Sequence, residues 1–224
     1  MKIPNVKSYL RNHLTSILLP LRAFRLGLRN RFASSTILDP AGPTISMTTY
    51  GLRLKDVHIV IETIAKGTVR PSRLMLYLDV EEDVLHPNKA LERLKKRGLE
   101  IHLAENLGPH TKVQWWIQNA PDFSRPHIIV DDDIFYPKWW LKRMLEAAKQ
   151  EPTSIMAYRA HRIVLTDDKK GLTPYTSWPP AIKGPSLLNL ATGCSGVLLP
   201  PNFLQIMREA GDGFLETCPR ADDI

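Results

Sequence analysis

Cysteine is scarce in this chain, since Cys194 and Cys218 are the only two among 224 residues. They form no C-x-x-C pair and belong to no cluster of cysteine and histidine, so a structural zinc site is not expected. Two cysteines do not build a disulfide framework either. A reducing compartment is therefore the better fit, and we expect a cytoplasmic protein.

The N-terminal segment lacks an apolar run long enough to cross a membrane. Its uninterrupted apolar stretch runs only from Ile17 to Leu19 and is ended by Pro20, whereas a spanning helix needs about 20 residues. No cleavage site of the A-x-A kind follows an apolar stretch, so the segment is a poor fit to a secretory signal.

Acidic residues are absent from the first 35 positions, and this absence explains the net charge of +7. The segment holds seven basic residues, which are Lys2, Lys7, Arg11, Arg22, Arg25, Arg29 and Arg31. The other 23 basic residues balance the 23 acidic ones, so the rest of the chain is neutral. A nucleic-acid-binding domain carries its basic excess on its own folded surface, so we expect no nucleic-acid partner.

Residues 1–35 are expected to form a basic amphipathic arm. Apolar side chains recur in it at helical spacing: Leu14, Ile17, Leu18, Leu21 and Phe24. One interpretation is a helix that lies on the inner face of the membrane, where anionic lipids attract its arginines. The alternative is an ordinary arm that packs on the domain or on a partner. Residues 36–224 are expected to form the folded domain.

From Thr44 onward, strand-like and helix-like segments alternate. Strands are expected at 44–49, 73–79, 99–104, 127–130 and 154–158, with helices at 54–66, 87–96, 111–119 and 138–149. Such βαβ repetition predicts an α/β fold with a mostly parallel sheet between helices. The alternation then ends, with a long loop expected at 167–184, a last strand at 196–199 and a helix at 202–210.

Three adjacent carboxylates, Asp131, Asp132 and Asp133, directly follow the apolar strand HIIV (127–130). Ligands of open α/β sheets bind at the carboxyl ends of the strands. Adjacent carboxylates repel one another unless a cation or water stabilises them, and Mg²⁺ and Mn²⁺ prefer oxygen ligands beside phosphates. The context favours a metal site, while the alternative is a solvated turn whose aspartate caps the next helix.

The same residues resemble the nucleotide-sugar site of glycosyltransferases with the GT-A fold, and more narrowly bacterial glycosyltransferases of surface-polysaccharide assembly. The resemblance covers roughly residues 44–224. Its segments are ISMTTYGLR (45–53), LGPHTKV (107–113), IIVDDDIFYPKWWL (128–141), AYRAHRI (157–163), TGCSGVLLPP (192–201) and CPRADDI (218–224). It implies a GT-A-like, Rossmann-like domain that moves a sugar from a UDP- or GDP-sugar to a glycan or lipid-linked acceptor.

The resemblance also implies roles for individual residues. Contacts to the nucleotide-sugar are implied for Thr49, Tyr50, Arg53, Lys112, Asp131, Asp132, Gly193 and Ser195. Asp131 and Asp133 would hold Mn²⁺ or Mg²⁺, with Asp133 as the direct ligand. Asp222 and Asp223 stand where inverting members of the group place a catalytic carboxylate.

The position of Asp222 and Asp223 leaves two other hypotheses open. Members of the group usually continue past this point, so we expect a chain truncated at its C-terminus. One alternative is therefore an inactive relative that binds nucleotide or metal and serves as a partner subunit. Another is a nucleotidyltransferase, although TTYGLRLK (48–55) has a single glycine where a glycine-rich basic loop would bind a triphosphate.

Overall fold

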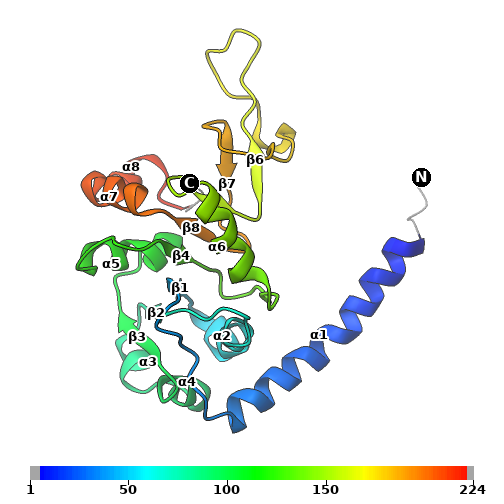
Figure 1. Ribbon diagram of the computed structural model, residues 1–224, viewed down its shortest axis with the longest axis vertical. Helices are drawn as coiled ribbons and strands as arrows, with labels where there is room; N and C mark the ends of the chain where they lie inside the picture. Colours follow the sequence, from blue (N-terminus) through cyan, green and yellow to red (C-terminus); the bar gives the residue numbers. More distant parts are fainter. Residues whose placement is uncertain (1–5, 221–224) are drawn as a thin grey trace.

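A six-stranded sheet forms the centre of the molecule (Figure 1). The computed structural model describes the backbone of residues 6–220 and the side chains of residues 18–220. The strand order across the sheet is β3-β2-β1-β4-β8-β5. The strands are β1 (Thr44–Thr48), β2 (Arg73–Leu78), β3 (Leu99–Leu103), β4 (His127–Ile129), β5 (Met156–Ala157) and β8 (Val197–Leu199).

The strand directions follow the alternation seen in the sequence. β1 pairs in parallel with β2 and with β4, and β2 pairs in parallel with β3. The connections from β1 to β2, β2 to β3 and β3 to β4 each contain a helix, as parallel pairing requires. β8 is antiparallel to both β4 and β5, because the chain reaches it from β5 without a crossover α-helix. The expected α/β fold with a mostly parallel sheet is confirmed.

Helices cover both faces of this sheet. The principal helices are α2 (Val57–Ala65), α4 (Lys89–Lys95), α5 (Thr111–Asn119), α6 (Trp140–Gln150) and α7 (Pro201–Ala210). One apolar core joins α2, α4 and α6 to the sheet, and a second core joins α5 and α7 to it. Along β2, Leu74 and Leu76 belong to the first core, whereas Met75 and Tyr77 belong to the second. A strand buried on both faces therefore reads as one continuous apolar run.

The expected helices all form, although some of their ends differ. α2 begins at Val57 because residues Gly51–Lys55 form a separate 3-10 helix, η1. α4 begins after Asn88, whose side chain accepts hydrogen bonds from the N–H groups of Ala90 and Leu91. α5 has the predicted ends, with a 3-10 turn, η2 (Gly108–His110), directly before it.

Several short elements were not expected from the sequence. They are α3 (Glu81–Leu85), α8 (Phe214–Thr217) and a two-stranded sheet of β6 (Ala160–Arg162) and β7 (Asn189–Ala191). Each is too short to show a period in its sequence. The expected loop at 167–184 contains one 3-10 turn, η3 (Tyr175–Ser177), and extends from the domain at the top of Figure 1.

The basic arm forms one long helix, α1 (Val6–Phe32), with Pro20 inside it. Its C-terminal part packs against α2 and α4, while its N-terminal part projects from the domain (Figure 1). Leu26 and Asn30 are buried in this contact, and the Arg29 Nε donates to the buried Glu62 carboxylate at 3.0 Å. Among the described residues, no helix is both long and apolar enough to cross a bilayer. The domain boundary at residue 36 stays a prediction.

Candidate functional site

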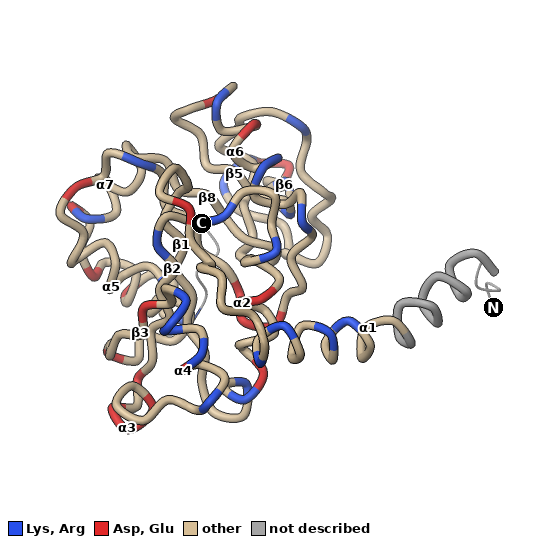
Figure 2. Tube along the Cα trace, turned by 60° about the horizontal axis from the view of Figure 1, so that its bottom comes forward, with Lys and Arg blue, Asp and Glu red and all other residues tan. Residues whose placement is uncertain are grey.

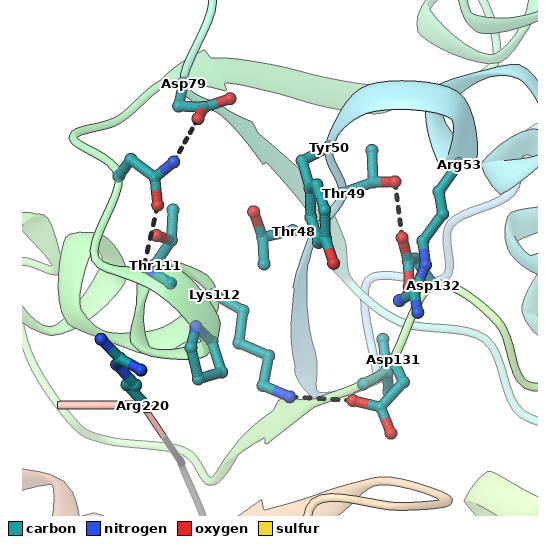
Figure 3. A pocket seen from close by; sticks show the side chains of 14 residues that line it. Thr48, Thr49, Tyr50, Arg53, Asp79, Thr111, Lys112, Asp131, Asp132 and Arg220 are labelled. Atoms are coloured by element: carbon teal, nitrogen blue, oxygen red, sulfur yellow. Dashed lines mark hydrogen bonds and ion pairs between the residues drawn. The ribbon is translucent and has the colours of Figure 1, made fainter. Parts of the chain in front are cut away.

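A cavity of about 440 Å³ lies at the carboxyl ends of β1, β2 and β4 and at the start of α5 (Figure 3). It is lined by Thr48, Thr49, Tyr50, Arg53, Asp79, Asn106, Gly108, Pro109, Thr111, Lys112, Val130, Asp131, Asp132 and Arg220. Parallel strands end at one edge of the sheet, so residues that follow different strands meet there. The predicted donor residues Thr49, Tyr50, Arg53, Lys112, Asp131 and Asp132 thus share one cavity.

Asp132 is held on one side of the cavity by two residues that follow β1. The Thr49 hydroxyl donates to its Oδ2 at 2.6 Å, and the Arg53 guanidinium donates to its Oδ1 at 2.9 Å. The Asp132 side chain is only 6% exposed, so these hydrogen bonds stabilise a carboxylate that has lost most of its water. In turn, the charge of Asp132 raises the pKa of Arg53.

Asp131 faces Lys112 across the cavity. The Lys112 ammonium donates to Asp131 Oδ1 at 2.9 Å, although the two residues come from α5 and from the end of β4 (Figure 3). Lys112 is in the first turn of α5, where the helix dipole opposes a positive charge. Its side chain is only 5% exposed. A buried ammonium at this position needs anionic partners, and Asp131 supplies one of them.

A second set of hydrogen bonds fixes the loop before α5. Asn106 Nδ2 donates to Asp79 Oδ2 at 2.5 Å, and Asn106 Oδ1 accepts from the Gly108 N–H at 2.9 Å. The Thr111 hydroxyl oxygen accepts from the Leu107 N–H at 2.9 Å. Gly108 has a φ of +61°, a value that glycine adopts without strain. These contacts position the first residues of α5 against the cavity.

Tyr136 fixes the turn of residues 131–133 that follows β4, which we call the acidic turn. Its hydroxyl oxygen accepts from the Asp131 N–H at 2.9 Å, and its own backbone N–H donates to the Thr63 hydroxyl at 3.1 Å. Burial, and then the nearby Asp131 charge, raises the pKa of this phenol. A neutral tyrosine in the core therefore ties the turn after β4 to α2.

The turn that contains Gly193 and Ser195 lies at the same edge of the sheet but outside the cavity lining. Since β8 is antiparallel to β4, its first residue pairs with Ile129, the last residue of β4. Ser195 has a φ of +74°, and its carbonyl accepts from the Trp140 indole N–H at 2.8 Å. The backbone of this turn is thereby fixed close to the acidic turn.

The chain after α7 is attached to α5. His110 Nε2 donates to the Cys218 carbonyl at 2.8 Å, and its ring lies 4.2 Å from that of Phe214. Gln114 donates to the Gly211 carbonyl at 3.2 Å. These contacts bring Arg220 to the cavity. The predicted catalytic residues Asp222 and Asp223 lie outside the described residues.

Some cavity residues were not predicted from the sequence, chiefly Asp79, Asn106, Thr111 and Arg220. Asp79 directly follows β2, as the acidic triplet follows β4, so the carboxyl-end rule applied to every strand would have found it. Asn106 and Thr111 belong to the loop and helix after β3. By contrast, the predicted Asp133 does not line the cavity, and its half-exposed carboxylate lies 3.6 Å from Arg53.

The side chains in the cavity that could hold a metal are carboxylates. No group of three or more Asp, Glu, His and Cys side chains suited to a metal occurs where side chains are described. Mg²⁺ and Mn²⁺ are often held by only one or two carboxylates together with phosphate oxygens. The carboxylates of Asp131 and Asp132, both in the cavity, fit such a shared site.

The sequence matches no protein-family model and no curated protein. Solved structures that resemble the fold include 4-diphosphocytidyl-2C-methyl-D-erythritol synthase from Anaerococcus prevotii. It has 11% identity and a TM-score of 0.48, over 83% of this chain and 87% of that one. Another is CMP:2-keto-3-deoxy-manno-octonic acid synthetase complexed with CTP, with 10% identity and a TM-score of 0.45. That match covers 80% of this chain and 85% of the synthetase.

A third similar structure is a mannosyltransferase from Pyrobaculum calidifontis in complex with GDP-Man and Mn²⁺. It has 13% identity and a TM-score of 0.41, over 67% of this chain and 45% of the mannosyltransferase. Likenesses of this size concern the α/β fold alone, and they do not assign an activity to this chain.

Proposed function

We propose that this chain is a metal-dependent glycosyltransferase that binds a nucleoside-diphosphate sugar in the cavity at the carboxyl edge of the sheet. It would move the sugar to a hydroxyl of a glycan or lipid-linked acceptor. One observation carries the proposal: the carboxylates of Asp131 and Asp132 share a single cavity with Lys112 and the first residues of α5. The first group suits a divalent metal, and the second suits a diphosphate.

The start of α5 is the proposed diphosphate site. The first turn of a helix presents unpaired N–H groups and the positive end of the dipole, which together favour phosphate. Gly108, Thr111 and Lys112 line the cavity at this point. A phosphate here would add a second anionic partner for the Lys112 ammonium, which already pairs with Asp131.

The proposed metal ligands in the cavity are Asp131 and Asp132. The Asp-x-Asp pattern of the sequence also implies Asp133, whose half-exposed carboxylate would join them from outside the cavity lining. When bound, Mn²⁺ or Mg²⁺ would neutralise the charge that develops on the departing nucleoside diphosphate. Thr49 and Arg53 would keep the Asp132 carboxylate oriented through the hydrogen bonds described above. Tyr50, which lines the cavity and is 64% exposed, would contact the nucleotide.

The remaining roles concern the acceptor side. Gly193 and Ser195 would leave room for the donor sugar beside the acidic turn. Asp222 or Asp223 would accept the proton of the attacking hydroxyl if the configuration is inverted, which is general-base catalysis. Both follow Arg220, a cavity residue, in the sequence.

Calorimetry with Mn²⁺ and a panel of UDP, GDP, UTP and CTP tests the donor site. We expect a nucleoside diphosphate to bind only with metal, and we expect Asp131→Asn and Asp132→Asn each to weaken binding at least tenfold. Asp133→Asn shows whether the third carboxylate also holds the metal. Asp167→Asn removes one exposed carboxylate in the distant loop and is the matched control.

The binding and product profile separates the alternatives. A folded chain that binds none of these nucleotides with metal present contradicts the proposal. Preference for a triphosphate and release of pyrophosphate would identify a nucleotidyltransferase instead. Diphosphate binding with no turnover of any donor would favour the inactive relative. The only glycine between β1 and α2 is Gly51, at the start of η1, which gives little support to a triphosphate loop.

A further inference from the structure

α1 has two different faces along its C-terminal half. One face packs on the domain: Leu26 is 6% exposed and Asn30 is 1% exposed. The Asn30 side chain donates to the Ala90 carbonyl at 3.1 Å and accepts from Arg93 Nε at 2.9 Å. Gly27 lies close enough to α2 that a Cβ there would be 3.8 Å from Ile59 Cδ1. This face is therefore occupied by the chain itself.

The other face carries a row of exposed apolar side chains, which we call the outer stripe. Its members are Leu18, Leu21, Phe24, Leu28 and Phe32, with exposed fractions of 48%, 44%, 63%, 40% and 74%. At 3.6 residues per turn they fall within an arc of roughly 120°, and Leu26 and Asn30 lie on the opposite side of the helix. The outer stripe thus points away from the domain.

Arginines border the outer stripe. On the same helical geometry, Arg25 lies at one edge of the outer stripe and Arg31 lies beyond the other edge. Arg22 lies next to the Arg25 edge, and its guanidinium is 5.8 Å from the centroid of the Phe135 ring of the domain. Figure 2 shows several basic positions, in blue, along α1 where it leaves the domain. The first acidic residue of the chain is Asp39, so no carboxylate on α1 neutralises them. An apolar row with arginines on both sides suits an interface where hydrocarbon and anionic groups meet.

We propose that the outer stripe docks on an anionic phospholipid surface, with α1 lying in the plane of the interface. The apolar side chains would enter the boundary of headgroups and acyl chains, while the arginines would contact lipid phosphates. Charge decides between this surface and a second copy of the chain. The outer stripe of a second copy has the same basic borders, so pairing of two copies is opposed by repulsion between like charges.

The docking surface does not depend on the proposed transferase activity. Basic residues outside residues 1–35 are balanced by acidic ones, so attraction to anionic lipid is concentrated in α1. The opposite face of the helix is fixed by the buried Glu62 and by Asn30, so docking through the outer stripe would also orient the domain.

Vesicle binding tests this proposal on the full chain. The probes are vesicles of phosphatidylcholine alone and vesicles with about one third phosphatidylglycerol, measured by cosedimentation at low and high salt. We expect binding only to the anionic vesicles, with weakening at high salt. Removing an interfacial arginine costs about fivefold in affinity, so Arg25→Gln with Arg31→Gln, two exposed positions, should weaken binding by roughly 25-fold.

Two further double variants complete the test. Leu21→Ser with Phe24→Ser should weaken vesicle binding at least tenfold, because both side chains would be buried in the interface. Lys149→Gln with Lys170→Gln removes the same charge from exposed positions outside α1 and should leave binding unchanged. Circular dichroism checks that each variant is folded. We expect folding to be preserved because the substituted side chains are exposed.

The proposal is overturned if the folded chain does not bind anionic vesicles at low salt. It is also overturned if the control pair weakens binding as much as the arginine pair does. Self-association of the wild-type chain that Leu21→Ser with Phe24→Ser abolishes, without any effect on vesicle binding, would assign the outer stripe to a second copy.

Discussion

The strongest stability prediction concerns the buried carboxylate of Glu62, which is 0% exposed. Two arginines reach it. Arg97, itself 4% exposed, contacts it with both terminal guanidinium nitrogens, through Nη1 to Oε1 and through Nη2 to Oε2 at 3.3 Å. Arg29 of α1 reaches Oε2 at 3.0 Å, but its side chain is 32% exposed. Arg97 is thus the main partner that compensates the buried charge.

We expect Arg97→Met to destabilise the domain by about 3 kcal/mol. Removal of one partner of a buried ion pair costs about 3–5 kcal/mol, because the remaining charge has lost both its partner and its water. The lower end applies here, since Arg29 still reaches the carboxylate. In urea, a loss of this size moves the unfolding midpoint down by about 1 M or more. Tryptophan fluorescence and circular dichroism should give the same midpoint.

Two further variants distinguish this mechanism from a general packing defect. In Glu62→Met with Arg97→Met, both charges are removed and much of the stability should return, because an apolar pair of similar size needs no compensation. Arg73→Met breaks the ion pair with Glu100, whose partners are 46% and 29% exposed, and should cost less than about 1 kcal/mol. The reasoning is refuted if Arg97→Met costs no more than Arg73→Met, or if the double variant is less stable than Arg97→Met.

Two more predictions concern pH and backbone geometry. His127 is 0% exposed and bonded to the hydroxyls of Thr44 and Ser46, and burial lowers its pKa from 6.5 to about 3. Between pH 6.5 and pH 3, His127 therefore binds a proton in the unfolded chain but not in the folded chain. The free energy of unfolding should fall by up to about 1.4 kcal/mol for each pH unit over this range as the pH is lowered. Urea titrations at pH values from neutral to acid measure this slope. An NMR titration in which the His127 ring becomes protonated with a midpoint near neutral pH would contradict the prediction. Gly196→Ala should cost about 2–3 kcal/mol, because Gly196 has a φ of +88° and an added Cβ would lie 2.7 Å from Trp140 Cζ2. Gly51→Ala, with a φ of +56° and open space around it, should cost only about 1 kcal/mol, and equal losses for the two variants would show that contact with Trp140 is not the cause.

The sequence predicted the parts of the fold that depend on local pattern. α5 forms over the range predicted after Gly108 and Pro109, and β2 forms because a strand covered on both faces is apolar throughout. α3 and the pair of β6 and β7 have no such signal, because a few residues cannot show a period. Their formation depends on contacts with distant parts of the chain.

The candidate site shows a similar division. Asp131 was predicted because it follows an apolar strand, but which carboxylates face the cavity could not be predicted. The alternation of side chains ends with β4 at Ile129, and the turn that follows is fixed by the Tyr136 hydroxyl instead. As a result, Asp131 and its immediate neighbour Asp132 both line the cavity. Contacts of Asp79 and Arg220 likewise depend on tertiary structure.

The charges that line the cavity also bear on whether donor binding depends on a metal. Three acidic residues, Asp79, Asp131 and Asp132, and three basic residues, Arg53, Lys112 and Arg220, line it within the described part of the chain. A nucleoside-diphosphate sugar brings about two negative charges, and a divalent metal compensates them, so the two would enter this cavity as a neutral pair. Without metal, the donor would meet three carboxylates, while Lys112 and Arg53 are already engaged with Asp131 and Asp132. Donor binding should therefore depend on metal, and equal affinity with and without a chelator would refute this account of the cavity.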